Sequence, residues 1–313
     1  MTPRSTGGRE PGRPSLRNAR PARDVRAYGD GRAPARAPVA DKRRALGQHF
    51  LRDISIVQAI VDAARLSRDD LCVEIGPGEG ALTFLLAAQA GRLLALEVDE
   101  GLIARLRPRL TPFSNAEIRH ADARRFDFST LPALRPSADG RVVVLGNLPY
   151  SVSKPILERL VAARTALSEM VLTLQKEVAE RVAAEPGGKE YGALSVLTQL
   201  YCEVRPVMTI PAGAFRPPPK VESAVLHLRV LPAPCVPVAD EGKFRGVVKA
   251  AFAQRRKTLA NTLAGGLGLP VKAVRPRLEA AGIDPARRAE TLSIDEFARV
   301  ASALEFLRGE EGE

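Results

Sequence analysis

Short apolar runs alternate with segments of helical period over residues 42–230, and this alternation constrains the fold more than any other feature. Strands that alternate with helices predict a doubly wound, Rossmann-like α/β sheet. Five apolar runs carry this pattern, at 71–75, 92–98, 116–122, 141–146 and 169–175. Two further runs, 203–210 and 223–230, have no helix between them and predict an antiparallel hairpin that completes a seven-stranded sheet.

The chain divides into three parts by composition. Residues 1–40 are rich in Arg, Pro and Gly without helical or strand period, which predicts a disordered tail. Residues 41–231 carry the alternating pattern and form the predicted α/β domain. Beyond a Pro-rich linker at 231–238, residues 239–313 are predicted to form a small all-helical domain, with helices at 243–264, 270–281 and 294–308.

The chain is strongly basic, with a formal net charge of +11 over 313 residues. The first 40 residues hold nine arginines and three acidic residues, so more than half of the excess charge lies in the tail. Such an excess favours a polyanionic partner, either nucleic acid or an anionic membrane surface, with an Arg-rich coding bias as the alternative. We favour a non-specific RNA-binding tail, or a mis-assigned start codon, over a transit peptide, because Pro and Gly disfavour the amphipathic helix of such peptides.

Cysteine spacing and hydropathy limit the environment that we expect for the protein. Cys72, Cys202 and Cys235 show neither paired nor metal-binding spacing, so we expect no metal site, no disulfide and a reducing, cytoplasmic compartment. The sequence contains no uncharged apolar run of about 18 residues, so no membrane span is expected. A monomer is the simplest expectation.

A Gly-rich turn, GPGEG, follows the first apolar run at 76–80. Gly76 and Gly78 allow a ligand to approach the backbone closely. Glu97 ends the next strand about 20 residues downstream, where a carboxylate can bind ribose hydroxyls. Because Ala81 completes the pattern G-x-G-x-x-A, the turn fits both NAD and S-adenosyl-L-methionine, and a tight turn without a ligand is the structural alternative.

Two later strand ends favour an enzyme that modifies a nucleobase over one that transfers hydride. Asp122 ends the third strand, where a carboxylate can accept from the amino group of adenine, although a turn or helix cap also explains it. The segment GNLPY, at 146–150, ends the fourth strand and faces the same crevice. There Asn147 offers hydrogen-bonding groups, Pro149 stiffens the turn, and the flat ring of Tyr150 suits stacking on a base.

Nine sequence blocks occur in an order that resembles the small-subunit ribosomal RNA adenine N6-dimethyltransferase family, over roughly residues 42–308. They are LGQHFLRD (46–53), VEIGPGEGALT (73–83), LEVDE, HADARRFDF, GNLPYSVSKPIL, LQKEVAERV (174–182), YGALSVLTQ (191–199), FRPPPKVESAV (215–225) and AFAQRRKTLANTL (251–263). The resemblance implies a class I methyltransferase sheet. It also implies methyl transfer from S-adenosyl-L-methionine to two adjacent adenines in the 3′-terminal hairpin loop of small-subunit rRNA, giving N6,N6-dimethyladenosine while the immature 30S subunit is assembled.

The resemblance further implies roles for individual residues. Reaction and base binding fall on Asn147, Leu148, Pro149, Tyr150 and Phe215, with Tyr150 and Phe215 stacking on the target base. Cofactor contacts fall on His49, Leu51, Gly76, Gly78, Glu97, Val98, Asp122, Ala123 and Asn147. His49 stands where the family usually has Asn, and both side chains can hydrogen-bond the methionine end of the cofactor. Binding of rRNA phosphates falls on Arg255, Arg256 and Lys257, which taken alone indicate only a solvated helix face.

Three other function classes stay open at this point. Large-subunit rRNA adenine methyltransferases that confer macrolide resistance share the fold and most motifs, although LQKE, YGALSV and QRRKTLAN favour the small-subunit type. A non-enzymatic factor that binds immature subunits is the second, and the intact Gly-rich turn and GNLPY argue against lost activity. An NAD enzyme, the third, leaves Asn147 and Tyr150 unexplained.

Overall fold

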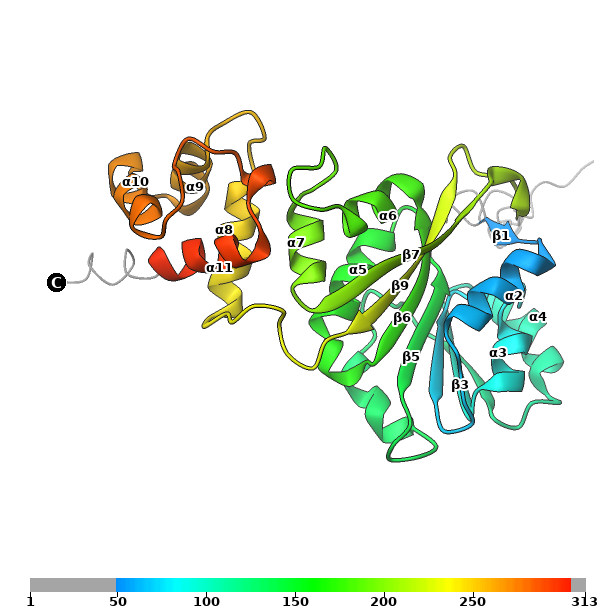
Figure 1. Ribbon diagram of the computed structural model, residues 1–313. Helices are drawn as coiled ribbons and strands as arrows, with labels where there is room; N and C mark the ends of the chain where they lie inside the picture. Colours follow the sequence, from blue (N-terminus) through cyan, green and yellow to red (C-terminus); the bar gives the residue numbers. More distant parts are fainter. Residues whose placement is uncertain (1–48, 305–313) are drawn as a thin grey trace, which may run out of the picture. The chain divides into compact units, whose positions relative to one another are not determined.

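The computed structural model describes residues 49–304, and a mixed sheet of seven strands dominates them (Figure 1). Its strand order is β4-β3-β2-β5-β6-β9-β7. Strands β2 to β6 pair in parallel, whereas β9 lies between β6 and β7 and pairs antiparallel with both. The strands are β2 (Leu71–Ile75), β3 (Arg92–Glu97), β4 (Ala116–His120), β5 (Val142–Asn147), β6 (Glu169–Gln175), β7 (Cys202–Ile210) and β9 (Ser223–Val230). The predicted doubly wound sheet with an antiparallel hairpin is confirmed, and the predicted tail at 1–40 lies outside the described residues.

Both faces of the sheet are covered by helices, which explains why its strands are apolar without interruption. Successive side chains of a strand point to opposite faces, so Val73 and Val144 join one apolar cluster while Cys72 and Val143 join another. The first cluster packs against α5 (Ser153–Ala162), α6 (Lys176–Ala183) and α7 (Ala193–Gln199). The second packs against α2 (Ile54–Ala63) and α3 (Thr83–Gln89), and α4 (Glu100–Leu110) covers β3 and β4.

The path of the chain reverses between β2 and β5. From β2 the chain proceeds outward to β3 and β4, and it then returns to place β5 on the other side of β2. The carboxyl ends of these two neighbours, Ile75 and Gly146, are paired residues. In open α/β sheets ligands bind in the crevice that such a reversal creates.

A second, two-stranded sheet joins segments that are far apart in the sequence. Its strands, β1 (Phe50–Leu51) and β8 (Phe215–Arg216), run antiparallel, with Phe50 opposite Arg216 and Leu51 opposite Phe215. The backbone N–H of Arg52 extends the contact by donating to the carbonyl of Ala214 at 2.9 Å. The segment before α2 is therefore held against the loop that precedes β9.

Within residues 49–304, four α-helices follow the last strand: α8 (Glu241–Ala251), α9 (Leu259–Leu267), α10 (Val271–Ala280) and α11 (Ile294–Ala303). The predicted continuous helix at 243–264 is wrong, because residues 252–258 form a loop between α8 and α9. Residues 49–304 all belong to one compact unit, so the predicted domain boundary near 231–239 stays a prediction.

Among the described residues, no helix combines the length and apolar character needed to cross a bilayer.

Candidate functional site

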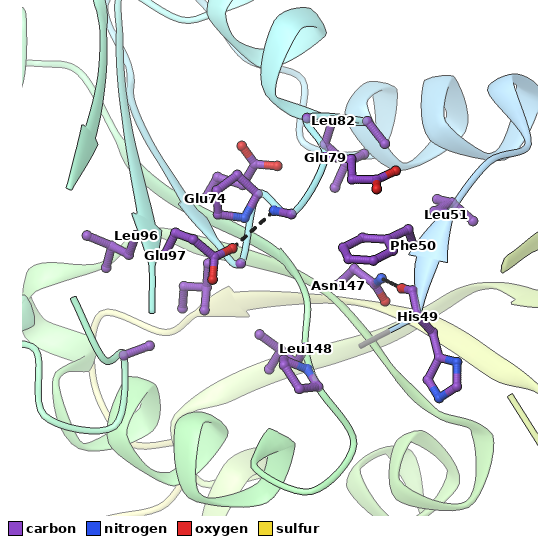
Figure 2. Close-up of a pocket in the computed structure, with 18 of the residues that line it drawn as sticks. His49, Phe50, Leu51, Glu74, Glu79, Leu82, Leu96, Glu97, Asn147 and Leu148 are labelled. Carbon is purple, nitrogen blue, oxygen red and sulfur yellow. Dashed lines mark hydrogen bonds between the residues drawn. The ribbon is translucent and has the colours of Figure 1, made fainter. Parts of the chain in front are cut away.

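A cavity of about 800 Å³ opens at the carboxyl ends of β2, β3 and β5 (Figure 2). This volume lies in the range of small-molecule and cofactor sites. Its lining includes residues 49–52 of β1 and its flanks, the Gly-rich turn, the ends of β3 and β4, and residues 147–152 at the end of β5 and after it. The sequence-predicted residues His49, Leu51, Gly76, Gly78, Glu97, Val98, Asp122, Ala123, Asn147, Leu148, Pro149 and Tyr150 all line this cavity.

The Gly-rich turn requires glycine by both conformation and space. Gly76 and Gly78 have φ angles of +71° and +58°, in the left-handed region that disfavours other residues. A Cβ atom on Gly78 would also lie 2.9 Å from the ring of Phe50. The backbone N–H of Gly76 donates to the carbonyl of Leu96 at 2.9 Å, which fixes the turn beside the end of β3. At Gly76 and Gly78 the turn therefore exposes backbone to the cavity.

Glu97 fastens the end of β3 to this turn. Its carboxylate is only 3% exposed and accepts hydrogen bonds from the backbone N–H groups of Gly78 (3.2 Å), Val98 (2.8 Å) and Asp99 (2.9 Å). Burial raises the pKa of Glu97, and these three donors offset part of that effect. The carboxylate is thus held rigidly at the position where the sequence predicts a ribose contact.

Glu74 is a second buried acid at this site, and the sequence analysis missed it. It is the fourth residue of β2, is 1% exposed, and lines the cavity (Figure 2). Among the described residues, its Oε2 atom has no hydrogen-bond partner. Burial raises the pKa of Glu74 to about 8, and the neighbouring Glu97 contributes to the rise. A charged residue inside the otherwise apolar run LCVEI was the signal that could have identified it.

We expect Glu74→Gln to become progressively more stable than the wild type as the pH rises from 4.5 to about 8. In this window the folded protein keeps a proton that the unfolded chain releases, because folding raises the pKa of Glu74 from 4.5 to about 8. Wild-type stability therefore falls with rising pH by at most about 1.4 kcal/mol per pH unit, and the neutral Gln removes this loss. Urea denaturation at about pH 5, 7 and 9 measures the difference. Glu158→Gln, at an exposed position, is the matched control, and a pH-independent difference for Glu74→Gln would contradict the argument.

Asn147, the last residue of β5, is held in one orientation by a hydrogen bond. The Nδ2 atom of Asn147 donates to the backbone carbonyl of His49 at 2.8 Å. A carbonyl can only accept, so this bond fixes which end of the amide faces β1 and leaves Oδ1 as the acceptor for a ligand. The next residue, Leu148, is 1% exposed and its backbone N–H donates to the carbonyl of Thr173 at 3.1 Å. An amide acceptor is thus presented at a defined place in the cavity.

Asp122 lies two residues after the end of β4 and lines the cavity. Its carboxylate accepts from the backbone N–H of Arg124 at 2.9 Å and pairs with the guanidinium of the same residue at 2.7 Å. Arg124 therefore lowers the pKa of Asp122, so the carboxylate is ionised near neutral pH. Arg124 Nε also donates to both carboxylate oxygens, at 3.0 and 3.1 Å, so a ligand amino group at Asp122 would share or replace bonds to Arg124.

Four of the predicted site residues do not lie at the cavity. Phe215 is 1% exposed and packs in an apolar cluster with Leu51, Ile210 and Val225, because its pairing with Leu51 turns the ring toward the core. It therefore does not face a base in the cavity in this structure. Phe50 and Phe84 line the cavity instead. Arg255, Arg256 and Lys257 are exposed in the loop between α8 and α9, and not on a helix face as predicted.

Comparison with known proteins identifies the family. Residues 39–305 match the family described as "Ribosomal RNA adenine dimethylase". The chain belongs to this family. It is 47% identical over 268 residues to the ribosomal RNA small subunit methyltransferase A of Pelotomaculum thermopropionicum, covering 84% of this chain and 91% of that protein. The corresponding protein of Shouchella clausii is 44% identical over 264 residues, covering 84% of this chain and 89% of the relative.

Two solved methyltransferase structures share the fold. A dimethyladenosine transferase from Plasmodium falciparum superposes with a TM-score of 0.71 at 26% identity, covering 84% of this chain and 98% of that chain. The 23S rRNA methyltransferase ErmE superposes with a TM-score of 0.62 at 25% identity, covering 82% and 99%. The predicted family, fold class and enzyme class, an rRNA adenine dimethyltransferase, are thereby confirmed. The family implies S-adenosyl-L-methionine as the methyl donor.

Proposed function

We propose that this protein transfers methyl groups from S-adenosyl-L-methionine to N6 of two adjacent adenines in the 3′-terminal hairpin loop of small-subunit rRNA, within an immature 30S subunit. The observation that carries the proposal is that one cavity combines the Gly-rich turn and Glu97 with the Asn147–Tyr150 segment. The small-subunit type is favoured because relatives named for the small subunit are 44% and 47% identical, against 25% for the 23S rRNA enzyme.

The cavity fits the proposed cofactor by shape and by charge. Gly76 and Gly78 leave room beside the backbone, since their positive φ angles exclude side chains. The buried Glu74 keeps a proton in the protein without a ligand, and one of its oxygen atoms lacks a partner, so a cationic ligand group beside it would favour its ionised form. When bound, S-adenosyl-L-methionine supplies a methyl group made electrophilic by a positively charged sulfur. The residues that would hold it are His49, Leu51, Gly76, Gly78, Glu97, Val98, Asp122, Ala123 and Asn147.

Asn147 and Leu148 would orient the target nitrogen. The lone pair of adenine N6 delocalises into the ring, so the amino group is a weak nucleophile. Acceptance of its two hydrogens by Asn147 Oδ1 and the Leu148 carbonyl favours a more tetrahedral nitrogen and directs its lone pair toward the methyl group. Asn147 can serve in this way because its amide is already fixed by His49. A proton leaves N6 to water after transfer, so the reaction requires no strong base.

Tyr150 would hold the ring of the base that has left its stack. The Tyr150 hydroxyl is 2.6 Å from Oγ of Ser223, which anchors the far end of the ring. An anchored ring loses little freedom when a base stacks on it. Pro149, one residue earlier, restricts the backbone at the same turn.

Methyl transfer from labelled S-adenosyl-L-methionine tests this function. Undermethylated 30S subunits and 50S precursors are supplied to the wild type and to Asn147→Ala. We expect the wild type to label two adjacent 30S adenines as N6,N6-dimethyladenosine and the variant to lose about 100-fold or more in rate, because its acceptor is missing. Thermal unfolding of both proteins shows whether the variant is folded. Label on 50S RNA would assign the large-subunit activity instead, and cofactor binding without label on either RNA would indicate a binding protein.

The loop between α8 and α9 is the proposed site of rRNA phosphate binding. Arg255, Arg256 and Lys257 are exposed there as neighbours in the chain. Arg255 also donates to the backbone carbonyl of Lys189 in the loop between α6 and α7. Arg255 therefore fixes the loop, while Arg256 and Lys257 are the charges to test.

The partner is rRNA in this proposal, and a monomeric state and cytoplasmic location stay predictions. Within residues 49–304, no group of three or more His, Cys, Asp or Glu side chains is placed to hold a metal ion.

We expect the double variant Arg256→Gln, Lys257→Gln to bind 30S subunits more weakly and with a flatter salt dependence. Loss of two phosphate contacts reduces the slope of log K against log salt by about 1.5. Titration of Kd at constant magnesium, over about 50 to 200 mM salt, measures this slope. The double variant Lys272→Gln, Arg275→Gln changes the net charge equally at two exposed positions of α10 and serves as the control. Equal slopes for wild type and the loop variant would exclude phosphate contacts by this loop.

A further inference from the structure

Tyr150 lies in a turn and not in the sheet, so the position of its ring depends on side-chain contacts. β5 ends at Asn147, and residues 150–152 form turns before α5 begins at Ser153. The backbone carbonyl of Tyr150 accepts a hydrogen bond from Oγ of Ser153 at 3.2 Å. At the other end of the residue, the phenolic hydroxyl is 2.6 Å from Oγ of Ser223. Tyr150 is therefore held at both ends, and Ser223 holds the tip of its ring.

Ser223, the first residue of β9, is held between two neighbouring strands. It is 0% exposed and pairs with Gln175 of β6 on one side and with Ile210 of β7 on the other. The residue before it, Glu222, is bound twice by Lys176: its carbonyl accepts from the backbone N–H at 3.0 Å, and its carboxylate pairs with Nζ at 2.8 Å. Strand positions hold functional side chains more precisely than loop positions do. Ser223 is thus a fixed point to which a residue of a turn is anchored.

Burial decides which of the two hydroxyl groups donates in this hydrogen bond. A buried hydroxyl whose hydrogen finds no acceptor destabilises the fold. Ser223 is fully buried, and within the described residues its Oγ has no hydrogen-bond partner other than Tyr150. Tyr150 is partly buried, so its own hydrogen can reach solvent or a ligand. The Ser223 hydroxyl therefore donates and the Tyr150 oxygen accepts. Burial raises the pKa of Tyr150, and this hydrogen bond offsets part of the rise.

A fixed tip determines the plane of the Tyr150 ring. A ring without this anchor has more freedom to tilt, and a base that stacks on it must remove that freedom, which opposes binding. Asn147, whose amide donates to the His49 carbonyl at 2.8 Å, presents the acceptor for N6. N6 meets this acceptor only when the base, and hence the ring beneath it, lies in the correct plane. Ser223 does not line the cavity, so its effect on the reaction passes through Tyr150.

We propose that Ser223 is a positioning residue for methyl transfer and that it acts through the Tyr150 hydroxyl alone. The proposal rests on the proposed function, in which Tyr150 stacks on the target adenine. The sequence analysis assigned no role to Ser223, although it lies in the block FRPPPKVESAV. The antiparallel hairpin of β7 and β9 thereby takes part in catalysis, because it fixes the serine that sets the plane of the base.

A double-mutant cycle tests this route. Ser223→Ala removes the donor, Tyr150→Phe removes the acceptor but keeps the ring, and the double variant removes both. For each protein, kcat/KM is measured with undermethylated 30S subunits, together with the calorimetric Kd for S-adenosyl-L-methionine and the temperature of unfolding. Ser168→Ala is the matched control, because the Ser168 hydroxyl accepts from the backbone N–H of Val142 at 3.2 Å, at the opposite, amino end of β5.

We expect each single change to lower kcat/KM about 5-fold, the effect of one hydrogen bond, and the double change to lower it about 5-fold rather than about 25-fold. Cofactor Kd should stay within about 2-fold of wild type in all variants, and Ser168→Ala should leave kcat/KM unchanged. Tyr150→Phe leaves the buried Ser223 donor without its acceptor, so the double variant should unfold at a higher temperature than Tyr150→Phe.

Two results would overturn the proposal directly: losses that multiply in the double variant, or single variants with unchanged kcat/KM. A loss of kcat/KM with an equal loss of cofactor affinity would also overturn it, because Ser223 would then only support the fold. If Ser223→Ala does not fold, Ser223→Cys, a weaker donor, takes its place in the cycle. Labelling of 30S adenines by the wild type establishes the proposed function whatever the variants do, so failure of one is distinguishable from failure of the other.

Discussion

The parallel pairing of β2 with β5 is the constraint on which the site depends. Its register places Glu74 opposite Leu145 and Ile75 opposite Gly146, so β2 ends one residue before the end of β5. The Gly-rich turn therefore leaves the sheet beside Asn147, the last residue of β5, and a Cβ atom on Gly76 would lie 3.9 Å from the Asn147 carbonyl. A slip of one residue would turn every side chain of a strand to the opposite face. The apolar layers on both faces prevent this slip and so hold the Gly-rich turn beside Asn147.

Burial of two acids at this junction opposes folding and favours a cationic ligand. Glu97 meets three backbone donors, so the loss of solvation is largely compensated. Glu74 has no such compensation at Oε2, and burial accordingly raises its pKa to about 8. A protein without a cationic ligand would be more stable with an apolar residue there. The retention of this destabilising residue inside a core strand is physically consistent with binding of a charged cofactor.

Structural features that follow from repeating patterns along the chain could be predicted from the sequence. Features that depend on contacts between distant segments could not. Alternating apolar runs predicted the seven strands, and their ends placed Glu97, Asp122 and Asn147 at one edge. The two-stranded sheet of β1 and β8 has too few residues for any pattern, yet it turns Phe215 into the core and leaves Phe50 at the cavity. Helical period likewise continued through residues 252–258, where the chain forms a loop. The local sequence pattern shows only the period of apolar residues. In short strands, the direction of a side chain depends on which distant strand the segment pairs with.

The two-stranded sheet of β1 and β8 also fixes the position of the two ends of the cavity relative to each other. β1 contributes Phe50 against the Gly-rich turn, and the preceding residue, His49, bonds through its carbonyl to Asn147. β8 continues into the segment whose Pro217 and Ser223 anchor the His49 and Tyr150 rings. Separation of β1 from β8 would release the ring of His49 and the amide of Asn147 together. The segments proposed to contact the cofactor and the base therefore meet at one pairing of four residues, so a change in that pairing would disturb both.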